Sequence, residues 1–425
     1  MQYNNSYLPP SLTSPPPTSA SGGGGGGYVP PHQLQNPSPQ QGLGGFGQGQ
    51  MGGFGGLSQL GAGQGQGQAQ GQGLRTLGVS PNSQAHNQTQ ISSQGQGQGA
   101  GQAAGDSIKV QPLLCSGHTR PVTHLQFSNL LDDGTYLLIS ACKDGNPMLR
   151  SWLGDWIGTF LGHKGAVWSS KISLDTSRAV TGSADFTAKI WDTYSGESLH
   201  TFSHNHIVRS VALNPQQTPQ YLLTGGHEKK IRLFDLGRPD AQPLVLGNRP
   251  DGLSCDGTIK SLVWDESSNG TTGVSAGEDG KVRWWDLRTL SEVGSLDLGE
   301  AVGSMEIAHG GGTLSVTAGS KVHFLDILRQ HPPVTIPLPH PATSASLHPF
   351  LRDRFAAGSA NDPWVRVYDL DTGKEKEVYK GHHGPVLGVA YSPDGEVYAS
   401  GSEDGTIRLW QTNPGKSYGL WQTQD

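Results

Sequence analysis

Residues His163, Thr181 and Asp185 bring an imidazole, a hydroxyl and a carboxylate into one short stretch of the sequence, and Trp191 follows them. The first three are the side-chain types of a hydrolytic triad, in which a base activates a hydroxyl nucleophile. A catalytic set of this kind is expected once in a chain. It also needs an open pocket in which a base of suitable pKa can reach a substrate.

The same residue types recur along the chain. A complete second set consists of His382, Ser400, Asp404 and Trp410. Partial sets are His118, Ser140 and Asp144; Ser275, Asp279 and Trp285, with Cys255 in the histidine position; and His204 and Thr224, with Glu228 and Phe234 replacing the acid and the tryptophan. Buried polar groups must be paired, and a repeated network can fix how strands meet. Recurrence therefore favours structural networks, and a hydrolase that uses the His163 network is the disfavoured alternative.

These networks lie in a repeat of about forty residues, a period typical of propeller blades. The positions aligned with Trp191 in seven copies are Arg150, Trp191, Phe234, Trp285, Leu325, Tyr368 and Trp410. Each copy has short runs such as "AKIW" and "TIRLW" between Gly, Asp, Asn and Pro turns, as antiparallel strands do. One blade cannot bury both of its faces, so blades must stack radially and close. We predict an all-β, seven-bladed propeller over residues 106–425.

Either end of this domain could close the ring. The segment "VQPLLCSGH" (110–118) matches the strand that precedes each repeat, and "GKSYGLW" (415–421) competes with it. We favour the N-terminal strand because joining the first and last blades protects an exposed sheet edge.

Residues 1–105 have a different composition. They are rich in Gly, Gln, Ser and Pro, and Arg75 is their one charged side chain. Such a segment cannot offset its conformational entropy by apolar burial, so we expect a disordered tail. Its "LPPSLTSPPP" could be a polyproline ligand, but we favour a passive linker or solubilising arm.

Composition also excludes several function classes. The chain holds 29 basic and 35 acidic residues, which argues against broad nucleic-acid binding and direct nucleic-acid readout. We find no signal peptide and no apolar run long enough for membrane insertion, so we expect a cytoplasmic protein, with the nucleus as a further location. The 3 cysteines lack CxxC spacing, and no pattern indicates a metal or a cofactor.

The repeats resemble the WD40 family. "PDGEVYASGSEDGTIRLW" is generic for that family, whereas "ACKDGNPMLR" and "GDWIGTFLGHKGAVW" are similar to the group associated with serine/threonine kinase receptors. The resemblance covers about residues 111–422. It implies a nonenzymatic adaptor in a survival-of-motor-neuron-type complex for spliceosomal ribonucleoprotein assembly, associated with ribonucleoprotein indirectly, and a modulator of receptor kinase signalling. The WD40 subunit of eukaryotic translation initiation factor three is the alternative.

In a propeller, the turns before the first strand and after the second strand of each blade line one rim of the central channel. We expect at this rim Thr123, Trp168, Arg209, Lys260 and Leu387, together with Lys143, Ala184, Glu278, Asn361 and Glu403. Trp168, near Lys164 and Arg209, combines the residue types that dominate interface energetics. An alternative of equal weight is that Trp168 packs against the neighbouring blade. Trp364 is a further exposed candidate.

Overall fold

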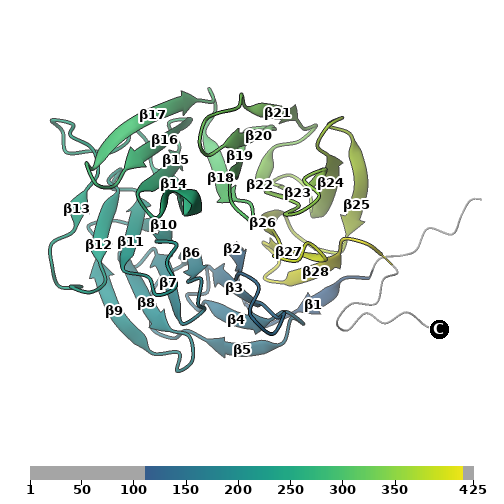
Figure 1. Ribbon diagram of the computed structural model, residues 1–425. Coiled ribbons are helices and arrows are strands. Elements are labelled where there is room, and N and C mark those ends of the chain that lie inside the picture. The colour runs from purple at the N-terminus through teal and green to yellow at the C-terminus, as the bar shows by residue number, and fades with distance from the viewer. Residues whose placement is uncertain (1–110, 415–425) are drawn as a thin grey trace, which may run out of the picture. The chain divides into compact units, whose positions relative to one another are not determined.

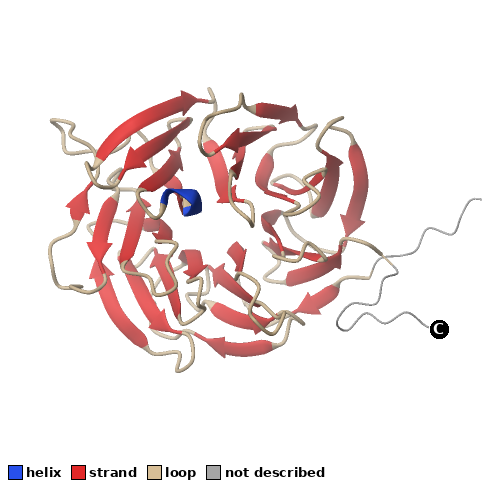
Figure 2. Cartoon of the chain, in the orientation of Figure 1, coloured by secondary structure: helices blue, strands red, loops and turns tan. Residues whose placement is uncertain are grey.

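The computed structural model describes residues 111–414, which form seven four-stranded antiparallel sheets. The sheets follow one another around a ring (Figure 1). The one helical element in residues 111–414 is a 3₁₀ turn, η1 (Glu266–Ser268), drawn in blue in Figure 2. The predicted all-β, seven-bladed propeller is therefore confirmed. The expected tail (1–105), the domain boundary at residue 106 and the alternative closing segment (415–421) lie outside the described residues.

The blades are numbered in chain order. Each blade has one strand at each of four concentric positions, from the innermost to the outermost. The innermost strands are β2 (Val122–Phe127), β6 (Val167–Ile172), β10 (Val208–Leu213), β14 (Ile259–Trp264), β18 (Val302–Ile307), β22 (Ala342–Leu347) and β26 (Val386–Tyr391). The second strands are β3 (Leu137–Cys142), β7 (Arg178–Ser183), β11 (Tyr221–Gly226), β15 (Thr272–Gly277), β19 (Thr313–Ala318), β23 (Arg354–Ser359) and β27 (Val397–Ser402). The third strands are β4 (Met148–Ser151), β8 (Thr187–Asp192), β12 (Arg232–Asp235), β16 (Lys281–Asp286), β20 (Lys321–Asp326), β24 (Trp364–Asp369) and β28 (Ile407–Gln411). The outermost strands are β5 (Trp156–Thr159), β9 (Ser198–Ser203), β13 (Leu244–Val245), β17 (Ser291–Asp297), β21 (Val334–Pro337), β25 (Glu375–Lys380) and β1 (Leu113–Cys115).

The ring closes through its N-terminal strand. β1 pairs with β28 of blade seven, with Leu113 opposite Leu409 and Cys115 opposite Ile407 (Figure 1). Leu113 packs against the apolar cluster that joins blades one and seven. The N-terminal choice for the closing strand is confirmed, and it covers the edge that β28 would otherwise expose.

The apolar core is divided among the seven junctions between neighbouring blades. The cluster at the junction of blades one and two, for example, contains Ile139, Phe160, Ile172 and Trp191, and Trp191 is fully buried. Full burial of a large apolar side chain contributes roughly 1.5–3 kcal/mol. Each blade therefore depends on both of its neighbours for its core.

The aligned repeat positions occupy one register in all blades. Trp191 lies opposite Ala179, the second residue of β7, and Trp410 lies opposite Tyr398, the second residue of β27. The equivalent pairs in the other blades involve Arg150, Phe234, Trp285, Leu325 and Tyr368. The seven-fold alignment read from the sequence is thus the alignment of the strands.

Serine hydroxyls on the innermost strands join neighbouring blades. The backbone N–H of Leu262 donates to the hydroxyl of Ser210 at 2.7 Å, and the N–H of Met305 donates to the hydroxyl of Ser261 at 3.1 Å. Ser344 accepts in the same way from Val389 at 3.2 Å. These bonds satisfy backbone donors that the first strands of blades four, five and seven cannot pair within their own sheets.

Candidate functional site

The His163 network is a closed set of hydrogen bonds that joins β7 and β8 of blade two to the loop before β6 and to the turn after β7. His163 Nδ1 lies 2.8 Å from Asp185 Oδ2, and His163 Nε2 lies 2.7 Å from Thr181 Oγ1. The indole N–H of Trp191 donates to Thr181 Oγ1 at 2.8 Å. Because the Asp185 carboxylate can only accept, the Nδ1 atom that faces it carries a proton, and Thr181 Oγ1, which accepts from the indole, can donate its own proton to Nε2. Thr181 is fully buried, so its hydroxyl is not presented to a substrate.

Blade seven repeats this geometry. His382 Nδ1 lies 3.1 Å from Asp404 Oδ2, His382 Nε2 lies 2.7 Å from Ser400 Oγ, and Trp410 donates to Ser400 at 2.8 Å. Burial opposes ionisation of Asp404, but hydrogen bonds from the His383 backbone and from Thr406 outweigh it and lower its pKa to about 2. Asp404 is therefore a firmly ionised acceptor that fixes the turn.

Two blades keep the network with substitutions. In blade four, Trp285 donates to Ser275 at 2.9 Å, and Cys255 Sγ lies 3.9 Å from the same hydroxyl. Asp279 pairs there with Arg283 at 2.7 Å instead of with a histidine.

In blade three, His204 Nε2 lies 2.8 Å from Thr224 Oγ1, and Glu228 pairs with Arg232. Phe234 packs its ring against that of His204. In these two blades an arginine completes the charge pair at the turn.

Two further blades replace the network by means that the sequence reading missed. Blade six has Ala357 where blades one to four and seven have a hydroxyl, and the phenol of Tyr368 lies 2.9 Å from His340 Nε2 instead. Blade five has an apolar set at these positions, Leu298, Val316 and Leu325, which packs in the cluster shared with blade four. Tyr368 was visible in the aligned repeats. Its partner His340 was not recognised, because the spacing between this histidine and the innermost strand differs from that in the other blades.

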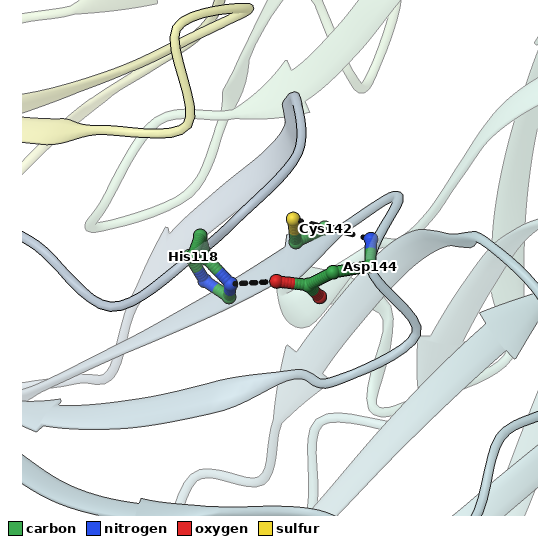
Figure 3. Close-up of side chains that lie close together, drawn as sticks. All are labelled: His118, Cys142 and Asp144. Atoms are coloured by element: carbon green, nitrogen blue, oxygen red, sulfur yellow. Dashed lines mark hydrogen bonds and ion pairs between the residues drawn. The ribbon is translucent and has the colours of Figure 1, made fainter.

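Blade one brings together His118, Cys142 and Asp144, three potential metal ligands within 4.8 Å of one another (Figure 3). His118 lies 3.1 Å from Asp144 Oδ2 and 2.8 Å from the hydroxyl of Ser140. The Cys142 thiol donates to the carbonyl of Arg120 at 3.0 Å and accepts from the backbone of Asp144 at 3.4 Å.

Cys142 takes the place that serine has in blades two and seven. Ser183 donates to the carbonyl of Gly165 at 3.2 Å and accepts from the backbone of Asp185 at 3.2 Å, and Ser402 makes the matching pair. Burial raises the pKa of the Cys142 thiol to about 12, and serine, which is not a usual zinc ligand, makes the same two bonds in blades two and seven. The three groups form a turn network rather than a metal centre.

A β-bulge places one residue per blade at the mouth of the central channel. In every blade the register between the first two strands shifts directly after the first residue of the innermost strand. Bulges re-aim a side chain away from the ladder. The residue that follows the shift lines one cavity of about 220 Å³ in all seven blades: Thr123, Trp168, Arg209, Lys260, Gly303, Thr343 and Leu387.

The structure brings part of the expected rim together around Trp168. The guanidinium carbon of Arg209 lies 3.7 Å from the centroid of the Trp168 ring, and Lys143 Nζ lies 5.3 Å from it. Cation–π contacts of this kind are worth about 0.5–2 kcal/mol. Trp168 is half-buried, so it both packs against its neighbours and faces the cavity.

Other expected rim residues lie apart from this cavity. Lys164 is exposed, and its backbone donates to Asp185 at 2.9 Å. Glu278 is exposed and pairs with Lys260 at 2.8 Å. Asn361 and Glu403 are exposed and Ala184 is half-buried, all in turns beside the cavity rather than in its lining.

Trp364 was expected to be exposed, but it is half-buried at the start of β24. Lys380 Nζ lies 4.2 Å from its ring centroid and the guanidinium of Arg366 lies 5.1 Å from it. Both cationic groups thus lie within cation–π distance of the ring, and the guanidinium of Arg366, which is itself buried, also pairs with Asp362 at 2.8 Å.

Three aromatic residues beside the rim were missed. The rings of Phe186 and His206 have centroids 5.4 Å apart, and His206 stacks on His227 at 5.0 Å. Burial, and then the nearby charge of Arg209, lower the pKa of His227. His227 follows Gly226, which pairs with Val208 at the bulge that carries Arg209, and its backbone N–H donates to the carbonyl of Ile207 at 3.1 Å, so this row begins beside the rim. A signal did exist: Phe186 has φ 66° at a turn position where Gly145, Gly280 and Gly405 stand in other blades. A bulky residue in the left-handed region is strained and calls for a functional explanation.

Seven four-stranded sheets, a repeated network of side-chain hydrogen bonds and a β-bulge in each innermost strand define this chain as a WD-repeat β-propeller. The family described as "WD domain, G-beta repeat" matches residues 154–192, 196–235 and 373–411. No helix among the described residues is long and apolar enough to cross a membrane.

Curated relatives identify the family within this class. The serine-threonine kinase receptor-associated protein of Homo sapiens is 46% identical over 317 residues, which cover 74% of this chain and 87% of that protein. The protein of the same name from Dictyostelium discoideum is 45% identical over 302 residues, 71% of this chain and 99% of that protein. The chain belongs to the family of serine-threonine kinase receptor-associated proteins. Eukaryotic translation initiation factor 3 subunit I of Culex quinquefasciatus is a more distant relative, 28% identical over 322 residues, 71% of this chain and 96% of that protein.

Proposed function

We propose that this chain is a nonenzymatic adaptor that holds partner proteins at the mouth of its central channel, within a multisubunit complex. The observation that carries the proposal is Trp168, whose ring lies within cation–π distance of Arg209 and Lys143 in the lining of the cavity. Tryptophan and arginine held in a fixed geometry lose little entropy on binding, and they are enriched among residues that dominate interface energy.

The absence of enzymatic activity is part of the proposal. The hydroxyls of Thr181 and Ser400 are fully buried, and each already has two hydrogen-bond partners. A nucleophile needs a free trajectory to its substrate, which these oxygens lack. The same network in several blades is explained by the need to pair buried polar groups.

The complex that we propose is of the survival-of-motor-neuron type, acting in spliceosomal ribonucleoprotein assembly. Two observations support this proposal. The chain belongs to the family of serine-threonine kinase receptor-associated proteins, and it contains more acidic than basic residues, 35 against 29. That balance favours indirect association with ribonucleoprotein through proteins. The name of the relatives supports a second role, in receptor kinase signalling. We place the protein in the cytoplasm and the nucleus, where such complexes assemble.

Affinity purification with matched tryptophan variants tests this proposal. Full-length wild type, Trp168→Ala and Trp156→Ala are expressed at equal levels, and the co-purifying proteins are quantified by mass spectrometry. Trp156 is 60% exposed on the outermost strand β5, away from the channel, so it controls for the loss of a surface tryptophan. We expect Trp168→Ala to lower partner recovery at least about tenfold, since a central anchor contributes roughly 2 kcal/mol or more.

The identity of the recovered proteins decides the finer proposal. Ribonucleoprotein assembly factors at stoichiometric yield support it. Cosedimentation with the small ribosomal subunit would favour the initiation-factor alternative instead. Equal recovery by wild type and Trp168→Ala would contradict the role of the channel mouth.

A further inference from the structure

The channel mouth carries an unbalanced positive charge. Lys143, Lys171, Arg209 and Lys260 come from blades one to four and line the same cavity of about 220 Å³. Among the described residues, no aspartate or glutamate lines this cavity. The positive charge is thus concentrated on one side of the mouth, in a chain whose net charge is −6. A cleft lined by one sign of charge attracts ligands of the opposite sign.

Three of these cations have no salt-bridge partner in the described part of the chain. Lys260 pairs with Glu278 at 2.8 Å, but Lys143, Lys171 and Arg209 have no carboxylate within 4.0 Å. Glu306 and Glu278 act on Lys171 and Arg209 from beyond that distance, and burial lowers the pKa of both cations. Partly desolvated cations without a counterion gain more from an added anion than solvated surface lysines do.

An aromatic row leads outward from this charged mouth. It runs from Trp168 and Arg209 to His227, which follows Gly226 opposite Val208 at the bulge, and then through His206 to Phe186. Phe186 is 44% exposed at the outer end. The strained φ of Phe186 holds an apolar side chain where a glycine would be easier to accommodate. A ligand that follows the row meets cations at one end and an aromatic surface at the other.

We propose that the channel mouth and the aromatic row bind an acidic peptide segment of a partner protein, with a carboxylate or phosphate in the cavity and an apolar side chain on Phe186. The inference rests on the proposed adaptor function and specifies the partner chemistry. Charge complementarity commits the site to an oxyanion, and the extended row commits it to a linear ligand rather than a free ion.

Other occupants fit less well. Residues 1–105 contain no aspartate or glutamate, so this chain's own N-terminal segment has no side-chain carboxylate to supply. Nucleic acid is normally held by basic residues spread along a face, whereas the unpaired cations here are confined to one cavity.

Fluorescence anisotropy on the full chain tests the inference with defined probes. The probes are a labelled glutamate-rich peptide that contains one phenylalanine, the same peptide with glutamine for glutamate, and a version with phosphoserine for some glutamates. A labelled uridine-rich RNA is the fourth probe. The proteins are wild type, Arg209→Gln, Phe186→Ala and Arg288→Gln, an arginine whose side chain is 72% exposed and pairs with Asp286 outside the cavity.

We expect the glutamate or the phosphoserine peptide to bind at least about tenfold more tightly than the glutamine peptide, because only the acidic probes supply the missing counterion. The tighter of the two acidic probes identifies carboxylate or phosphate as the source. Arg209→Gln should weaken binding at least about tenfold and Phe186→Ala about threefold or more, whereas Arg288→Gln should leave it unchanged.

Three results would overturn the inference: equal binding of the acidic and glutamine peptides, equal binding by wild type and Arg209→Gln, or Arg209-dependent binding of the RNA without the peptides. Partner recovery with Trp168→Ala is measured in parallel. If that recovery falls while no acidic peptide binds, the adaptor function stands and only its acidic specificity fails.

Discussion

Replacing Thr181 by valine tests whether the repeated networks are structural. The change keeps the shape of the side chain and removes its hydroxyl. The indole N–H of Trp191 and Nε2 of His163 would then both lose their partner, at contacts of 2.8 and 2.7 Å. Both side chains are fully buried, so water does not replace the hydroxyl.

The expected cost follows from these two lost partners. An unsatisfied buried polar group costs about 1–3 kcal/mol, so two cost about 2–6 kcal/mol. The added methyl group returns up to about 0.8 kcal/mol by burial. We therefore expect Thr181→Val to lower the free energy of unfolding by about 2–5 kcal/mol, a large part of the roughly 5–15 kcal/mol that a folded domain has.

The assay is equilibrium denaturant unfolding followed by tryptophan fluorescence, with Thr201→Val as control. Thr201 is an exposed residue of β9 in the same blade, so its replacement should change stability by no more than about 0.5 kcal/mol. If the two variants lose the same stability, the network is not a structural lock and our reasoning is refuted. Loss of an enzymatic turnover without loss of stability would favour the hydrolase alternative.

A double-mutant cycle with Trp191→Phe separates the two lost bonds. Blade three shows that phenylalanine is accommodated at this position, since Phe234 lies there beside Thr224. With phenylalanine at 191 the indole donor is absent, so Thr181→Val should cost about 1–3 kcal/mol less than in the wild type. Additive effects would mean that the bond between Trp191 and Thr181 contributes nothing.

Three further predictions concern the turns and the closure of the ring. Cys142→Ser should change the free energy of unfolding by less than about 1 kcal/mol, because serine makes the same two bonds in other blades; Cys142→Val should cost about 1–3 kcal/mol, both measured by denaturant unfolding. Hydrogen bonds that outweigh burial hold the pKa of Asp404 at about 2, below its ordinary 3.8. The unfolded chain therefore binds more protons, so stability should fall as pH drops from about 5 to 2, and Asp404→Asn should flatten this slope in an acid titration of unfolding. Leu113→Asp should lower the melting temperature by several degrees through loss of β1, whereas Leu114→Asp, at a position 54% exposed, should not.

The fold was predictable because the repeat carries its own register. The position of Trp191 can be aligned in all seven repeats, and turn residues lie between the strands. The alignment alone therefore predicted which strands pair. The closing strand was predictable on physical grounds, since an uncovered edge on β28 would be a liability. Insertions between strands changed the loops but did not change which strands pair.

The candidate site was only partly predictable, because it depends on contacts between different blades. The turn positions of the repeat placed Trp168 and Arg209 at one rim, but their 3.7 Å contact joins residues from neighbouring repeats. Lys171 lies on β6, the same strand as Trp168. It was missed in the sequence because no local pattern indicates that it faces the cavity. Phe186 was detectable as a bulky residue in a glycine position, but its stacking on His206 required the folded arrangement.

Hydroxyl-radical footprinting of the native complex tests the central claim most directly. Oxidation of individual side chains is compared by mass spectrometry between the free chain and the chain bound to its partners. We predict that Trp168 and Phe186 are protected in the complex, while Trp156 and Tyr194, exposed at 60% and 85%, react at unchanged rates. Equal oxidation of Trp168 and Phe186 in the free and bound chain would contradict binding at the channel mouth.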